Sequence, residues 1–193
     1  MKKVFIIHGF GGIPNGGWFP WLMGELEKKG ICCTSLLMPD TNNPVVLKWV
    51  AEISHAVGDD YSNTYFVAHS LGVPALLHYL ETVPAGNTIA GALLVAGVID
   101  PIDTENPQSR FRGIDSFLRP EIRFAEVKDK AAKFLVLHGT VDATVPFVQA
   151  EKLSVNLGCE LRAVAGGTHF SQRTPPIYYE LPEALAALLD ILK

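Results

Sequence analysis

The sequence has few cysteines, little net charge and no long apolar run, and each shortage excludes a class of protein. Its three cysteines, Cys32, Cys33 and Cys159, have no metal-ligand spacing, and the adjacent pair is a poor candidate for a structural disulfide. We expect three reduced, mostly buried thiols and no metal site. Sixteen Lys and Arg against 20 Asp and Glu give a net charge of −4. Because no basic run could follow a phosphate backbone, nucleic acid is not an expected partner.

No apolar stretch approaches the roughly 18 residues that a membrane-spanning helix needs, so we expect no membrane partner. After Lys2 and Lys3 only four apolar residues, 4–7, precede His8, which is too short for the apolar region of a signal peptide. These two absences predict a cytoplasmic protein.

Six short apolar runs alternate with stretches long enough for a helix, which is the order of elements in an α/β domain. The runs are continuous, as in parallel strands that are buried on both faces. They are Val4–His8, Cys33–Leu37, Tyr65–Ala68, Ala90–Ala96, Phe134–His138 and Leu161–Val164. Between them, apolar residues recur with the 3.6-residue period of helices that bury one face. We therefore expect one domain, residues 1–193, folded as a three-layer α/β sandwich with about six parallel strands and helices on both faces.

The second helix and one long connection are the least regular parts of this pattern. Asn43 and Pro44 predict the start of the second helix, as N-cap and first residue. The segment 97–126 is longer than an ordinary connection. It is either one more surface helix with irregular flanks or a small lid over the carboxyl ends of the strands, where open α/β sheets bind their ligands.

The most specific motif is residues 67–72, Val-Ala-His-Ser-Leu-Gly, in which a predicted strand runs into a small-x-Ser-x-Gly turn and then a helix. A nucleophile elbow requires this context, because small neighbours let strand and helix pack closely around a strained serine. Ala68 stands where the first glycine is usual. On its own the serine could instead be a helix N-cap, but the strand before it and the amphipathic helix after it favour Ser70 as a nucleophile.

An acid and a base follow in the chain order of α/β-hydrolases. Asp142 comes just past the fifth predicted strand, and His169 just past the sixth. With Ser70 they would lie at the carboxyl ends of parallel strands, on one edge of the sheet. Asp100, at the end of the fourth strand, is the alternative acid, and we favour Asp142 because of its Gly-x-x-Asp-x-x-Val-Pro context.

A glycine-rich turn, residues 8–12, follows the first strand, where a hydrolase aims a backbone N–H at the developing oxyanion. We expect the two donors to be the N–H groups of Leu71 and Phe10, with Gly11 as the alternative to Phe10. A dinucleotide fingerprint is disfavoured because Pro14 occupies the third glycine position. A P-loop fails because Gly17 and Trp18 replace its Lys and Ser/Thr.

Four stretches of the sequence carry a resemblance to a known family: residues 8–12, 18–22, 67–72 and 166–170. They look like the retinoblastoma-binding protein 9 family of small serine hydrolases, and the resemblance covers essentially the whole chain. It implies a minimal α/β-hydrolase fold without a large cap domain. By motif it also places the catalytic residues at Ser70, Asp142 and His169.

Together these observations predict a serine hydrolase that acts on small carboxylic esters through an acyl-enzyme, without a cofactor. The same residues could serve a thioesterase or a small-peptide amidase. A protein-binding module that retains the fold is a further alternative, although nothing in the sequence indicates a protein partner. Because only residues 97–126 could cover the site, we expect a short, partly open pocket for compact acyl groups. The candidate lining residues are Gly11, Trp18, Phe19, Phe111 and Phe117.

Overall fold

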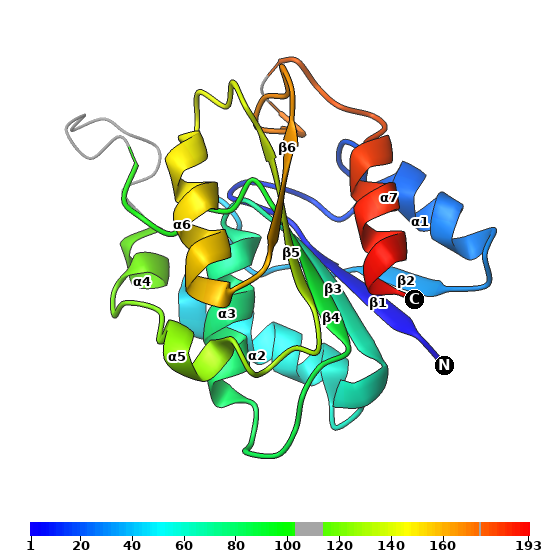
Figure 1. Ribbon diagram of the computed structural model, residues 1–193, viewed down its shortest axis with the longest axis vertical. Coiled ribbons are helices and arrows are strands. Elements are labelled where there is room, and N and C mark those ends of the chain that lie inside the picture. Colours follow the sequence, from blue (N-terminus) through cyan, green and yellow to red (C-terminus); the bar gives the residue numbers. More distant parts are fainter. Residues whose placement is uncertain (103–113, 174) are drawn as a thin grey trace.

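The computed structural model describes residues 1–102, 114–173 and 175–193. Six parallel strands form one sheet in the order β2-β1-β3-β4-β5-β6 (Figure 1). They are β1 (Lys3–Ile7), β2 (Cys32–Ser35), β3 (Thr64–His69), β4 (Gly91–Val95), β5 (Phe134–Gly139) and β6 (Glu160–Val164). Each predicted strand is present, so the parallel α/β fold class is confirmed.

Helices cover both faces of this sheet (Figure 1). The long helices are α1 (Phe19–Glu27), α2 (Val46–Val57), α3 (Gly72–Thr82), α6 (Phe147–Leu157) and α7 (Pro182–Ile191). Successive strand residues point to opposite faces. Val4 and Ile6 of β1 belong to the apolar cluster that includes residues of α1 and α7, whereas Ile7 belongs to the cluster that includes residues of α2, α3 and α6. Two apolar cores therefore flank the sheet, as the three-layer prediction requires.

Burial on both faces holds only for the inner strands. Every residue of β4 and β5 is buried, but β2 and β6 contain exposed residues because they form the edges of the sheet.

The three cysteines lie in or directly beside these edge strands. All three are free, but Cys32 in β2 is exposed, so the prediction of mostly buried thiols is wrong there. Cys33 and Cys159 are partly buried, and burial raises the pKa of Cys33 to about 12 and that of Cys159 to about 11.

The second helix begins two residues later than predicted. α2 starts at Val46, with Val45 in an extended conformation as its N-cap. The residues before α2 form a loop that is held by two backbone hydrogen bonds. The Asn43 N–H donates to the Asp40 carbonyl, and the Gly11 N–H donates to the Thr41 carbonyl. A short 3-10 helix, η1 (Tyr61–Asn63), leads into β3.

The described part of segment 97–126 extends the helical layer. Its two short helices, α4 (Asp115–Leu118) and α5 (Phe124–Val127), pack against α3. The Phe117 ring is fully buried and meets the Trp49 ring edge to face, with 5.2 Å between centroids. Phe111 falls in 103–113, outside the described residues.

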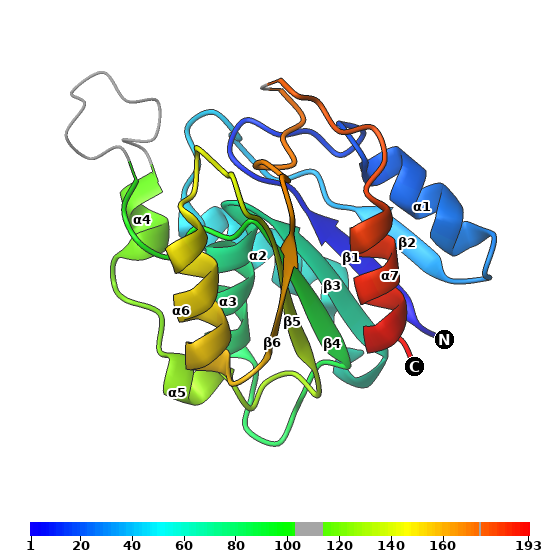
Figure 2. The same ribbon diagram turned by 45° about the horizontal axis from the view of Figure 1, so that its top comes forward.

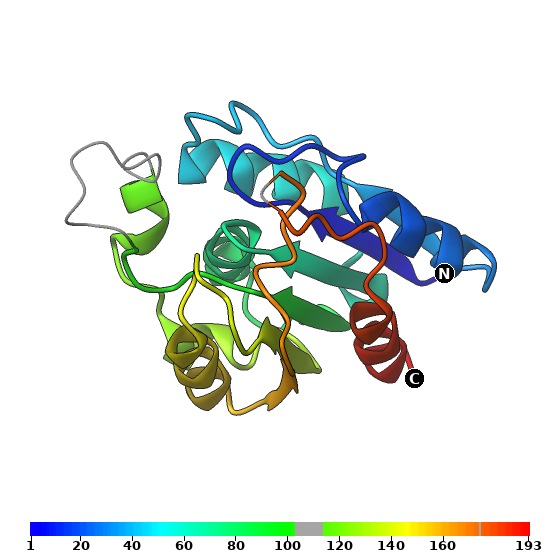
Figure 3. The ribbon, with the colours of Figure 1, turned by 90° about the horizontal axis from the view of Figure 1, so that it is seen from above.

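The loops that follow the strands at their carboxyl ends meet at one edge of the sheet. Figure 2 shows the loops after β1 and β6 side by side above this edge, and Figure 3 shows the same edge from above. Within the described ranges no helix is both long and apolar enough to cross a bilayer.

Candidate active site

Ser70 lies in a sharp turn between β3 and α3. Its φ is +55°, a left-handed conformation that is costly for a residue other than glycine. The turn is held from both sides, because the Ser70 N–H donates to the Val95 carbonyl at 2.9 Å and the Ser70 carbonyl accepts from the Val73 N–H at 3.0 Å. At Gly72 a Cβ would lie 2.5 Å from the Ile7 carbonyl oxygen. The glycine therefore lets α3 begin against the end of β1, as the elbow motif predicts.

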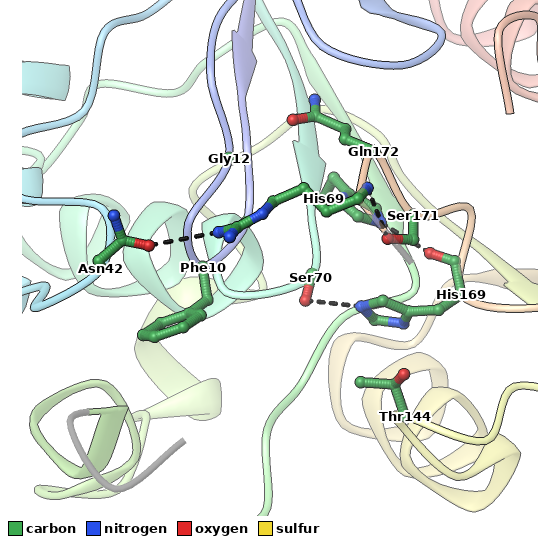
Figure 4. A pocket seen from close by; sticks show the side chains of 11 residues that line it. Phe10, Gly12, Asn42, His69, Ser70, Thr144, His169, Ser171 and Gln172 are labelled. Carbon is green, nitrogen blue, oxygen red and sulfur yellow. Dashed lines mark hydrogen bonds between the residues drawn. The ribbon is translucent and has the colours of Figure 1, made fainter. Parts of the chain in front are cut away.

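Three residues far apart in the sequence form a chain of hydrogen bonds at this edge. His169 Nε2 lies 2.9 Å from Ser70 Oγ (Figure 4), and His169 Nδ1 lies 2.7 Å from Asp142 Oδ2. Asp142 follows β5 and His169 follows β6. The other candidate acid, Asp100, is paired with Lys152 instead.

Asp142 accepts hydrogen bonds at both carboxylate oxygens. Its Oδ1 receives the N–H groups of Thr144 at 2.8 Å and Val145 at 2.9 Å. Its Oδ2 lies 3.3 Å from Nε2 of the buried His138 as well as against His169. Burial alone would raise the pKa of Asp142, but the hydrogen bonds from His138 and His169 outweigh burial and hold that pKa well below its usual range. Asp142 is therefore a fixed carboxylate.

The loop that carries His169 is held by side chains from the end of β3 and from the N-cap of α1. The His69 Nε2 lies 2.8 Å from the His169 carbonyl oxygen, which can only accept, so the ring is protonated at Nε2. Trp18 Nε1 donates to the Phe170 carbonyl at 3.1 Å. Burial, followed by the neighbouring His169, lowers the pKa of His69 to about 3. His69 is thus a neutral donor, a role that its position beside Ser70 did not reveal in the sequence.

The loop after β1 runs directly against the serine. A Cβ on Gly9 would lie 2.8 Å from Ser70 Cβ. Leu71 is the N-cap of α3, where backbone N–H groups have no acceptor within the helix. The N–H of Gly11, the alternative second donor, already donates to the Thr41 carbonyl at 2.6 Å. The Gly11 N–H is therefore engaged by another loop, and the assignment of Leu71 and Phe10 as oxyanion donors stays a prediction.

A partly open cavity of about 380 Å³ lies over Ser70 and His169 (Figure 4), at the small end of ligand-binding pockets. Most of its lining residues have polar side chains. The lining residues are Gly9, Phe10, Gly12, Asn42, His69, Ser70, Thr144, His169, Ser171, Gln172 and Arg173. Among the described residues of 97–126, none belongs to this lining.

The predicted aromatic lining of the cavity is wrong for the described residues. Phe19, in the apolar stripe of α1, and Trp18, its N-cap, are fully buried in the core, and Phe117 is buried against Trp49. Gly11 is not in the lining either, because its carbonyl is covered by the guanidinium of Arg173, whose Nη1 donates to it at 3.0 Å.

Sequence patterns did not reveal Asn42, Gln172 and Arg173 as lining residues. Arg173 Nη1 also lies 3.3 Å from Asn42 Oδ1. Gln172 Oε1 accepts from the Ile13 N–H at 3.2 Å, and its Nε2 donates to the Gly16 carbonyl at 3.0 Å. The one available signal was that Gln172 and Arg173 lie within four positions of His169 in the sequence. In the part of the chain that the structure describes, no three His, Cys, Asp or Glu side chains gather as metal ligands would.

Comparison with known proteins agrees with this geometry. Residues 4–188 match the family described as serine hydrolase. The chain is 30% identical over 184 residues to protein YdeN of Bacillus subtilis (strain 168), covering 93% of this chain and 94% of YdeN. The crystal structure of the B. subtilis ydeN gene product superimposes with a TM-score of 0.90 at 28% identity, covering 100% of this chain and 99% of that chain.

More distant structures share the fold. Est1E of Butyrivibrio proteoclasticus, solved with ferulic acid, has a TM-score of 0.73 at 16% identity over 100% of this chain and 90% of its own. A monoacylglycerol lipase of Paleococcus ferrophilus has a TM-score of 0.72 at 16% identity over 98% and 93% of the two chains.

Proposed function

This chain belongs to the serine hydrolase family, and from that premise we propose that it hydrolyses small carboxylic esters with Ser70 as nucleophile. The observation that carries the proposal is the unbroken chain from Ser70 Oγ through His169 to Asp142, at 2.9 and 2.7 Å. The motifs that resemble the retinoblastoma-binding protein 9 family agree with it, and we expect the enzyme to act in the cytoplasm.

In the proposed reaction Ser70 Oγ attacks the ester carbonyl carbon while His169 Nε2 takes the hydroxyl proton. The N–H groups of Leu71 and Phe10 stabilise the oxyanion of the tetrahedral intermediate. When this intermediate collapses, His169 returns the proton to the leaving alcohol, and an acyl group remains on Ser70.

Water then repeats the sequence. His169 takes a proton from the water that attacks the acyl carbonyl, and gives it back to Ser70 Oγ as the carboxylic acid leaves. Throughout, Asp142 keeps the proton of the neutral imidazole on Nδ1 and stabilises the imidazolium that forms.

A fluorophosphonate probe and an ester assay test this proposal together. The probe should label wild-type protein at Ser70, and phenyl acetate should be hydrolysed. The Ser70→Ala variant should show neither reaction. Labelling without ester turnover would indicate a different acyl substrate, such as a thioester or small peptide. Absence of labelling in the folded wild-type protein would contradict the role of Ser70.

A further inference from the structure

The rim of the cavity carries one cationic side chain. Arg173 lines the same cavity as Ser70, and its Nη1 bonds the Gly11 carbonyl and Asn42 Oδ1. These two anchors come from the loops after β1 and β2. Both are neutral acceptors, so they position the guanidinium without neutralising its charge.

Among the described residues, no carboxylate is paired with Arg173. The described lining of the cavity includes no Asp or Glu. Within the described residues, Arg173 forms no ion pair, whereas Arg162 in β6 is bonded to Glu160 and Asp190. Asp40, two residues before Asn42, is itself paired with Lys48 at 2.9 Å. In a chain of net charge −4, this leaves a positive charge at the mouth of the cavity.

The guanidinium retains capacity to bind a ligand. An arginine has five N–H donors in a planar fork, and carboxylates accept two of them side by side. Among the described residues, the hydrogen bonds that Arg173 donates from its guanidinium are made by Nη1. The polar groups of Asn42 and Gln172 beside it would suit a hydrated, charged substrate group better than an alkyl chain.

We propose that Arg173 forms a carboxylate-binding subsite, so that the preferred substrates are small esters that carry a carboxylate besides the scissile bond. This inference rests on the proposed ester hydrolysis at Ser70. A carboxylate on the acyl group or on the leaving group has the same chemistry, and the experiment below has an arm for each. The cavity volume of about 380 Å³ limits both to compact molecules.

Two matched pairs of esters measure the contribution of charge. 4-Acetoxybenzoate and its methyl ester differ by a carboxylate on the leaving group, and monophenyl glutarate and its methyl ester differ by a carboxylate on the acyl group. The kcat/KM for phenol release from each charged ester, divided by that for its neutral partner, gives a selectivity for each pair. Because the same ratio is taken for every variant, a general loss of activity cancels.

Three variants test the subsite and one is a control. Arg173→Met removes the charge, Arg173→Lys keeps the charge without the fork, and Asn42→Asp places a carboxylate beside the intact arginine at nearly constant shape. Arg123→Met removes an exposed arginine that pairs with Glu81, at the opposite end of α3 from Ser70, and serves as the control.

In at least one pair we expect selectivity to fall about tenfold in Arg173→Met, as for loss of a hydrogen bond to a charged group. It should fall similarly in Asn42→Asp, less in Arg173→Lys, and stay constant in Arg123→Met. Raising ionic strength from about 0.05 M to about 0.5 M should also lower the wild-type selectivity. Changes under threefold in both pairs for Arg173→Met and Asn42→Asp would overturn the proposal.

Failure of the ester hydrolysis itself would be visible separately, as a wild-type protein that turns over none of the four esters. The subsite is then judged by calorimetric titration with glutarate. Binding that weakens at least threefold in Arg173→Met supports a carboxylate site, and absence of binding to wild-type protein contradicts it.

Discussion

Two neighbouring groups of residues around the cavity differ in how firmly they are held. The first, which we call the inner cluster, consists of Ser70, His69, His138, Asp142 and His169. Its side chains are joined to one another and to backbone groups by hydrogen bonds between 2.7 and 3.3 Å. The second, which we call the rim, consists of Asn42, Gln172 and Arg173, whose side chains bond mainly to loop carbonyls and face the cavity.

This difference indicates that the inner cluster serves the chemical reaction, whereas the rim serves substrate recognition. The inner cluster is buried or nearly so, which strengthens each hydrogen bond and fixes the directions in which protons can move. The rim meets solvent, where a single contact is worth less but can be changed without disturbing the fold. Changes in the inner cluster should therefore have large effects on turnover, and changes at the rim should alter substrate preference.

The largest effect should come from Ser70→Ala. Removing the nucleophile should lower kcat for phenyl acetate by about 10⁶, the loss measured when a triad serine is removed in a well-studied case. The free energy of unfolding should change little, because the side chain is small. The exposed Ser62 provides a control, Ser62→Ala, which should retain wild-type turnover. Retention of more than about a tenth of wild-type activity in Ser70→Ala would show that another group is the nucleophile.

A loss of about 10⁴ in kcat is expected for Asp142→Asn, as in a serine protease whose triad aspartate was changed in the same way. The amide would no longer hold the His169 proton on Nδ1. Asp100→Asn is the matched control, because Asp100 is paired with Lys152 and does not contact His169. Steady-state kinetics give kcat for the two variants. A greater loss of kcat in Asp100→Asn than in Asp142→Asn would overturn the assignment of Asp142 as the acid that orients His169.

The buried neutral His69 should make the fold sensitive to acid. In the unfolded chain a histidine takes up a proton near pH 6.5, whereas in the folded protein the pKa of His69 is about 3. Between these values the unfolded state binds more protons, so the free energy of unfolding should fall as the pH is lowered from about 6.5 to 3. The slope from His69 would be at most about 1.4 kcal/mol per pH unit.

Denaturant titrations at a series of pH values test this contribution. His69→Gln keeps a neutral N–H donor, so it should flatten the dependence on acid even if it lowers stability at pH 7. His55→Gln, at an exposed histidine, is the control and should leave the slope as it is. Equal slopes in wild-type protein and His69→Gln would refute the prediction.

The smallest expected effect is the dependence of kcat/KM on the length of the acyl group, which is set by the cavity. A partly open cavity of about 380 Å³ should favour compact acyl groups, so kcat/KM should be about tenfold higher for acetyl to butyryl esters than for decanoyl esters. A chain-length series of phenyl esters measures this. A value of kcat/KM that still rises at ten carbons would mean that a long groove adjoins the site.

Much of the fold follows from patterns that are local in the sequence. The apolar runs and helical stripes predicted all six strands and the alternation of elements, because buried parallel strands must be apolar throughout. Helix boundaries were less certain: Asn43 and Pro44 have the chemistry of a helix start, but a loop contact to Gly11 delays α2 to Val46. Such a contact joins residues about 30 positions apart, so no local pattern contains it.

Local residue patterns were enough to predict the parallel α/β sheet, the strained turn at Ser70 and the positions of Asp142 and His169, because each depends on residue types at a strand end. The groups that surround these residues depend on the tertiary structure. It buried Trp18 and Phe19 in the core instead of the cavity, and it gave His69 a hydrogen bond to a loop 100 positions away. It also brought Asn42 and Arg173 together over Ser70. These placements depend on how separate loops meet in space, which is set by packing across the whole sheet edge.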